Sequence, residues 1–112
     1  MKAMLTLIAG STLLLSQVGY TAGPGDAAAG EAKSASCAAC HGPTGNGDNP
    51  TFPILAGQYR DYLVQALTDY KNGGRNNAIM KGFAAGLSKE DILDLAAFYS
   101  SQESSLQTPK AN

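Results

Sequence analysis

Two cysteines and a histidine stand close together in the stretch Cys37-Ala38-Ala39-Cys40-His41, and the sequence contains no other cysteine or histidine. A disulfide between residues only three apart closes too short a loop to stabilise a fold much. The C-x-x-C-H pattern is typical of covalent haem attachment. Each thiol would add to one vinyl group of the porphyrin. His41 would then lie under the iron and supply the proximal ligand.

Three other interpretations of the cysteine pair remain. A thioredoxin-like redox pair needs a βαβ context, and the sequence predicts no strand. A zinc site needs more ligands than one histidine and two cysteines, and the sequence holds no further Cys or His. The third is a plain disulfide beside an unrelated histidine. The adjacent His41 favours haem over all three.

The second axial ligand decides what such an iron could do. Met1 and Met4 lie in an N-terminal segment that we expect to be removed, so Met80 is the one methionine of the mature chain. Thioether sulfur is an iron ligand that raises the reduction potential, and we predict Met80 as the sixth ligand. Ligation by Lys81 or Lys71 and a vacant position are the alternatives. Two protein ligands leave no position for a substrate, which favours an electron carrier.

The N-terminal segment, residues 1–22, has the layout of a secretory signal peptide. A short basic start precedes an uncharged, mostly apolar stretch over residues 3–18, and small residues follow. We expect cleavage between residues 22 and 29, which leaves 23–112 as one domain in the periplasm. The apolar stretch is short and interrupted for a retained membrane anchor, so no stable membrane insertion is expected.

Composition limits the function classes further. The chain carries 8 basic and 9 acidic residues, a formal net charge of -1, which argues against a nucleic-acid partner. With 44% hydrophobic and 15% charged residues, the chain is not expected to be disordered. It has no tryptophan and many small residues. A domain this small often needs a disulfide, a metal or a bound cofactor to be stable.

The sequence around these residues predicts three helices, no strand and therefore an all-α fold. Each helix has a start or stop signal of a known kind. The first is capped by Asp26 and runs from Ala27 into the haem motif, the second spans about Gln58 to Lys71 and ends at Gly73-Gly74, and the third spans Lys89 to Ser101 with Ser88 and Asp91 as a capping box.

Long irregular segments are predicted between the helices. Residues 42–53 are rich in glycine and proline, and residues 75–87, which include Met80, are interrupted by Gly82 and Gly86. Residues 103–112 are expected to form a frayed polar tail. Such long loops would argue against a compact domain, unless they pack against a bound haem.

Taken in order, these motifs resemble the class I c-type cytochromes. The similarity is to the small bacterial monohaem cytochrome c-553 group and to single domains of dihaem cytochrome c-4, and it covers residues 25 to about 102. The residues that carry it are Gly25-Asp26, Gly30, the haem motif 37–42, the stretch 53–58, Tyr62-Leu63, Met80, Leu87-Ser88 and the stretch 95–99.

The resemblance implies a small cytochrome c fold, with three main helices and long loops wrapped around one covalently attached haem c. Gly30 would lie where the first and last helices cross, against Tyr99. The carbonyl of Pro53 would accept the Nδ1–H of His41 and fix the imidazole. Candidates for contacts with the haem propionates, otherwise solvated surface residues, would be Gln58, Tyr59 and Arg75.

These observations predict a periplasmic monohaem electron carrier rather than an enzyme. The single C-x-x-C-H allows one haem for each chain, and a monomer is expected to shuttle electrons between membrane or periplasmic redox proteins. The alternative is a haem-bearing subunit of a larger dehydrogenase or oxidase complex. A third hypothesis is an open-site haem protein that binds gas or peroxide.

Overall fold

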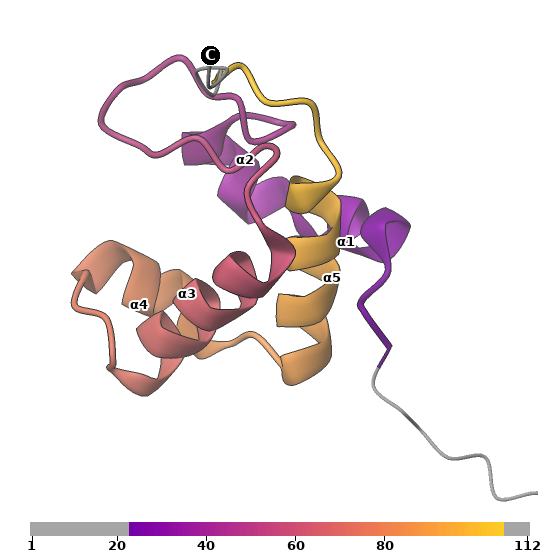
Figure 1. Ribbon diagram of the computed structural model, residues 1–112. Helices are drawn as coiled ribbons and strands as arrows, with labels where there is room; N and C mark the ends of the chain where they lie inside the picture. Colours follow the sequence, from indigo (N-terminus) through magenta and orange to yellow (C-terminus); the bar gives the residue numbers. More distant parts are fainter. Residues whose placement is uncertain (1–22, 107–112) are drawn as a thin grey trace, which may run out of the picture.

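The computed structural model describes residues 23–106, and this part of the chain is all-helical (Figure 1). The predicted all-α class is therefore confirmed. The expected signal peptide and the last part of the tail, residues 107–112, lie outside the described residues. The helices are α1 (Ala27–Lys33), α2 (Ala35–His41), α3 (Arg60–Asn72), α4 (Ala78–Ala85) and α5 (Lys89–Ser100).

The first predicted helix is two short helices. Asp26 caps α1 as expected, because its carboxylate accepts the backbone N–H groups of Ala28 and Ala29 at 2.8 and 3.1 Å. The prediction of one continuous helix was wrong at Ser34, which separates α1 from α2. The Ser34 hydroxyl donates to the carbonyl of Glu31 at 2.8 Å, a local bond that competes with helix continuation.

Helices α1 and α5 cross at Gly30. A Cβ at this position would lie 2.0 Å from the carbonyl oxygen of Asp94 and 2.8 Å from the Cβ of Phe98. The predicted crossing is therefore present, but the aromatic neighbour is Phe98 and not Tyr99. Successive helical residues point about 100° apart, and the ring of Tyr99 instead packs against Gly45.

An ion pair between an exposed lysine and a buried aspartate joins the same two helices. Asp94 of α5 is only 4% exposed. It accepts the backbone N–H of Asp26 at 2.8 Å and the Lys33 ammonium at 2.6 Å. Lys33 also lies 2.9 Å from Asp91. The bond from Lys33 lowers the pKa of Asp94, and it lowers the pKa of Asp91 to about 2, so both carboxylates stay ionised well into acid.

Helix α4 lies in the segment 75–87 that was predicted to be irregular, and this prediction was wrong. Asn77 begins the helix by accepting the backbone N–H of Met80 at 3.0 Å. Gly82 lies inside this helix and does not interrupt it, because a glycine lowers helix stability only by about 1 kcal/mol. Gly86 ends the helix instead of breaking it.

The core is small and formed mainly by α5. Leu95, Ala96, Phe98 and Tyr99 pack with Leu63 of α3, and α4 packs against α3. The predicted capping box at the start of α5 is present, since the Ser88 hydroxyl accepts the backbone N–H of Asp91 at 3.0 Å and the Asp91 carboxylate accepts that of Ser88 at 2.8 Å.

The long loop after α2 is irregular, as predicted, and it folds back on the helices. Gly47 donates its N–H to the carbonyl of His41 at 2.8 Å, and Gly57 donates to that of Tyr99 at 3.0 Å. The side chain of Asn46 bonds the backbone of Glu103 and Ser105 at 2.7 Å each. Within residues 23–106, no helix has the length and apolarity needed to cross a bilayer.

Candidate haem site

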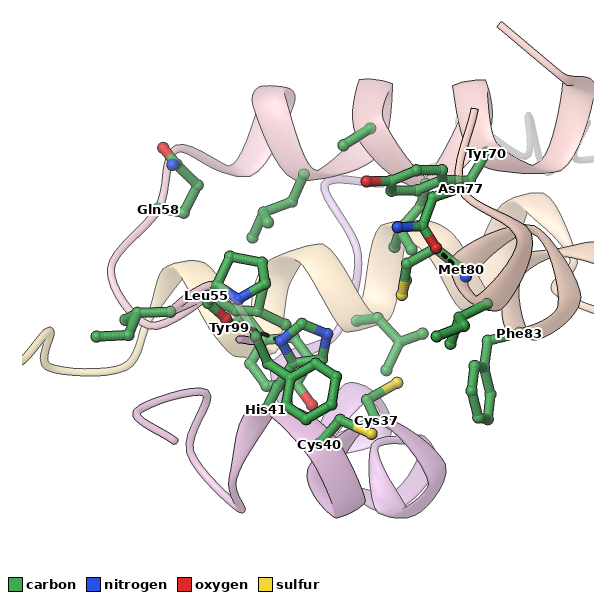
Figure 2. Close-up of a pocket in the computed structure, with 18 of the residues that line it drawn as sticks. Cys37, Cys40, His41, Leu55, Gln58, Tyr70, Asn77, Met80, Phe83 and Tyr99 are labelled. Carbon is green, nitrogen blue, oxygen red and sulfur yellow. Dashed lines mark hydrogen bonds between the residues drawn. The ribbon is translucent and has the colours of Figure 1, made fainter. Parts of the chain in front are cut away.

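A cavity of about 340 Å³ lies between α2, α3 and α4, with α5 and the segment 51–55 completing its walls (Figure 2). Every predicted site residue lines it except Tyr59, which is 84% exposed. Those that the fold brings together here are Cys37, Cys40, His41, Pro53, Gln58, Arg75 and Met80.

One wall carries the C-x-x-C-H motif. Cys37 and Cys40 are three residues apart on α2, and this spacing puts both thiols on one face of the helix. Neither thiol is in a disulfide, and both are partly buried. His41, the last residue of α2, is also buried. Figure 2 shows the three side chains extending from α2 toward the cavity.

The His41 ring is held in one orientation. Its Nδ1 lies 2.8 Å from the carbonyl oxygen of Pro53, the partner that the resemblance implies. A carbonyl oxygen can only accept, so Nδ1 must carry the hydrogen. The ring of Phe52 also meets the imidazole edge-on, at 6.2 Å between centres. In the neutral ring, Nε2 then keeps a free lone pair for a metal.

Met80 lies in the first turn of α4, and its side chain enters the cavity from a different wall than the C-x-x-C-H motif, which lies on α2 (Figure 2). It was predicted to lie in a loop, and the helix corrects this. The two lysines weighed as alternative ligands do not line the cavity. Lys71 donates to the carbonyl of Leu87, and Lys81 is exposed on α4.

Arg75 supplies the one formally charged side chain of the cavity lining. Its guanidinium lies over two tyrosine rings of α3, at 5.0 Å from the centre of Tyr70 and 5.9 Å from that of Tyr62. Gln58 is at the cavity wall and accepts the backbone N–H of Tyr59 at 2.8 Å. The cavity thus has a cationic group but no Asp or Glu in its lining.

Tyr99 is the one buried side chain of the described structure whose polar atom lacks a hydrogen-bond partner. Tyr99 is among the residues that line the cavity, and burial raises the pKa of its hydroxyl. A buried orphan hydroxyl is unusual in a filled protein interior.

The donor set fits a covalently bound haem. Two thiols, an imidazole and a thioether are the groups that bind haem c and its iron. The guanidinium suits an anionic edge, and the remaining walls are mostly apolar, which suits a flat macrocycle. The principal apolar residues of these walls are Ile54, Leu55, Leu63, Leu67, Ile79, Phe83 and Leu95.

Sequence reasoning missed several cavity residues. Asn77, Phe52, Tyr62 and Tyr70 line the cavity but were assigned no role there. Only Asn77 had a readable signal, because an asparagine before a run of helix-forming residues is a good N-cap. The positions of the aromatic residues depend on tertiary packing.

The comparisons with known proteins agree on one family. A family model described as Cytochrome c matches residues 27–103. Cytochrome c-554(548) of Halomonas halodenitrificans is 52% identical over 82 residues, covering 70% of this chain and 99% of that protein. The crystal structure of reduced cytochrome c4 from Pseudomonas stutzeri aligns with a TM-score of 0.70 and 45% identity, covering 73% of this chain and 48% of that one.

A further relative is named for its redox role. The thiosulfate dehydrogenase electron acceptor of Thiomonas intermedia is 43% identical over 83 residues, covering 72% of this chain and 38% of that protein. The chain spans about half the length of the cytochrome c4 relatives that it matches.

Proposed function

The chain belongs to the cytochrome c family of electron carriers, and we propose that it is a periplasmic monohaem member that passes single electrons between redox proteins. Haem c would supply a reversible one-electron Fe(II)/Fe(III) couple. Cys37 and Cys40 would hold it by thioether bonds, both from the same face of α2. Covalent attachment suits a domain whose core is too small to retain a large group by packing alone.

The proposal is carried by one observation, which is that His41 of α2 and Met80 of α4 line the same cavity. His41 would be one axial ligand, with its ring fixed by the Pro53 carbonyl, a contact of the kind that raises ligand basicity. Met80 would be the other and would raise the reduction potential. With both axial positions filled, the iron has no position for a substrate, so the protein is a carrier and not itself an enzyme.

Arg75 and Gln58 are the candidates for the propionate side of the group. Arg75 is the one charged residue of the lining and is already held by Tyr62 and Tyr70, so little side-chain entropy remains to be lost on binding an anion. Tyr59 does not line the cavity, and we assign it no role.

We also propose one haem for each chain and a periplasmic location, and two features of the sequence support this. One C-x-x-C-H motif allows one haem c for each chain. The signal-like segment 1–22 supports export to the periplasm. We expect a monomer there, with membrane or periplasmic oxidoreductases as partners, and neither nucleic-acid binding nor stable membrane insertion.

Carbon monoxide tests the ligation directly. The reduced protein should not bind it, because both axial positions are occupied, whereas a Met80→Ala variant should bind it readily. Ile79→Ala is the matched control, since it also removes a cavity-lining side chain but leaves the sulfur in place. Rapid binding by the unmodified protein would refute the carrier and favour a gas-binding or peroxide-binding site.

A stably bound subunit of a dehydrogenase or oxidase complex is the second candidate. The similarity to a thiosulfate dehydrogenase electron acceptor favours it. Gel filtration of a native periplasmic extract separates the two candidates. A free carrier elutes as a small monomer, and a subunit elutes with its enzyme.

A further inference from the structure

The helix that carries Met80 packs against the rest of the fold on one side and lines the cavity with Ile79, Met80 and Phe83. Ala84, at 0% exposed, is the one buried residue of α4. Extensive helix-to-helix contact within the described residues links α4 only to α3. By contrast, α5 contributes six buried residues and contacts both α1 and α3. Met80 lies in the first turn of α4, so its position depends on how this end of the helix is held.

That end is fixed by Asn77. Its backbone is extended, with φ −157° and ψ 114°, so it lies just outside the helix. Its side-chain oxygen accepts the backbone N–H of Met80 at 3.0 Å, and its own carbonyl accepts the N–H of Lys81 at 2.9 Å. Figure 2 shows the first of these bonds beside the cavity. The cap thus bonds directly to the residue whose sulfur enters the site.

Asn77 is in turn held relative to α3 by the short connection before it. Gly73 ends α3 in the left-handed conformation. Arg75 donates its backbone N–H to the carbonyl of Asp69 at 3.1 Å and places its guanidinium over Tyr70. A restrained connection followed by a side-chain cap fixes the first turn of α4 against α3, which forms a wall of the cavity.

We propose that Asn77 is a positioning residue that holds the Met80 thioether at the haem iron and limits how often the sixth coordination position opens. The inference rests on the proposed ligation by Met80. Without the cap, the first turn of α4 loses its hydrogen bond at Met80 and unwinds more easily. The attachment of the haem through α2 does not involve this turn and stays unchanged.

Imidazole binding to the oxidised haem protein measures the opening. Imidazole can bind the iron only in molecules whose Met80 sulfur has left it. Its apparent affinity is therefore proportional to the fraction of molecules in this open state. Loss of an N-cap side chain typically changes such an equilibrium by about fivefold. Asn77→Ala should therefore bind imidazole about fivefold more tightly and lose its iron–sulfur absorption band at a lower temperature. Asn77→Ser and Asn77→Asp, which keep a capping oxygen, should remain close to the parent.

Ser88→Ala is the matched control. Ser88 caps α5 through an equivalent bond, accepting the N–H of Asp91 at 3.0 Å, but it does not line the cavity. The variant should unfold at a lower temperature while its imidazole affinity stays that of the parent. If Asn77→Ala yields no folded protein, hydrogen exchange of the Met80 amide in the parent provides the second measurement. Its opening constant should equal the one derived from imidazole competition.

The results that would overturn the inference are specific. They are an imidazole affinity unchanged in Asn77→Ala, an equal increase in Ser88→Ala, or a Met80 amide that exchanges with a different opening constant. A failure of the proposed function looks different, because the parent itself would then lack the iron–sulfur band and bind imidazole without competition.

Discussion

At the residue scale, the chemistry of the site follows from local spacing, but its surroundings do not. Cys37, Cys40 and His41 lie within five consecutive residues, so their proximity needed no knowledge of the fold. Met80 could be selected only because it is the single methionine outside the signal-like segment. The contact of Arg75 with two tyrosines of α3 could not be predicted, since it depends on how the segment after α3 folds back onto that helix.

Arg75 gives the prediction at this scale. Its positive charge at the cavity disfavours Fe(III) relative to Fe(II), so Arg75→Gln should lower the reduction potential by tens of millivolts, as expected for a partly screened charge at this range. Arg75→Lys should lower it less, because the charge remains while the fit over the tyrosine rings is lost. Redox titration of the purified variants measures the change.

Arg60→Gln is the control for this effect. Arg60 is a cation at the start of α3 that donates to the carbonyl of Pro24 at 2.8 Å and does not line the cavity. Its replacement should leave the potential unchanged. If Arg75→Gln also left the reduction potential unchanged, the side chain of Arg75 would not interact with the iron.

At the scale of the helices, periodicity and capping signals located α3 and α5 within a residue or two of their bounds. Helix α4 was missed because Gly82 was taken as a helix breaker, although a single glycine costs a helix only about 1 kcal/mol and Gly82 lies within α4. Gly30 shows the converse, because its predicted role was correct and its partner was not. Which of two adjacent aromatic residues faces α1 depends on the rotation of α5, which the sequence does not determine.

The two helical glycines predict opposite effects of the same substitution. Gly30→Ala should destabilise the fold by about 2–3 kcal/mol, because the new Cβ would lie 2.0 Å from the Asp94 carbonyl and force α1 away from α5. Gly82→Ala has free space and should stabilise α4 by about 0.5–1 kcal/mol. Urea unfolding followed by circular dichroism measures both, and equal effects of the two would contradict the close crossing.

The bond between Lys33 and Asp94 predicts how stability depends on pH. The pKa of Asp94 is lowered in the folded state, so its stabilisation is complete above the unfolded pKa of about 4 and is lost as the pH falls through the folded value. Asp94→Asn should cost about 2 kcal/mol near pH 7, the size typical of a charge-assisted hydrogen bond, and this cost should shrink toward pH 2.

Unfolding curves of parent and Asp94→Asn between pH 2 and pH 8 test this prediction. Asp91→Asn is the comparison, since Asp91 bonds the same ammonium at 2.9 Å but is more exposed, and its loss should cost less. A difference between parent and Asp94→Asn that grows toward acid would contradict the account.

At the scale of the whole molecule, the fold is a small helical frame built around a cavity. The all-α class was predictable because no strand pattern competes with the helical periodicity. The return of residues 42–57 onto α2 and α5 was not, because it depends on single backbone bonds such as that from Gly57 to Tyr99. These contacts bring Pro53 to His41, at the cavity that Met80 of α4 also lines.

The most direct test of the central claim is a visible absorption spectrum of the protein matured with haem, recorded oxidised and then reduced. The account predicts a sharp low-spin c-type spectrum on reduction and a weak red band from iron–sulfur ligation in the oxidised form. A covalent haem without the red band would contradict ligation by Met80. Absence of covalent haem would contradict the whole account and return Cys37 and Cys40 to thiol–disulfide chemistry.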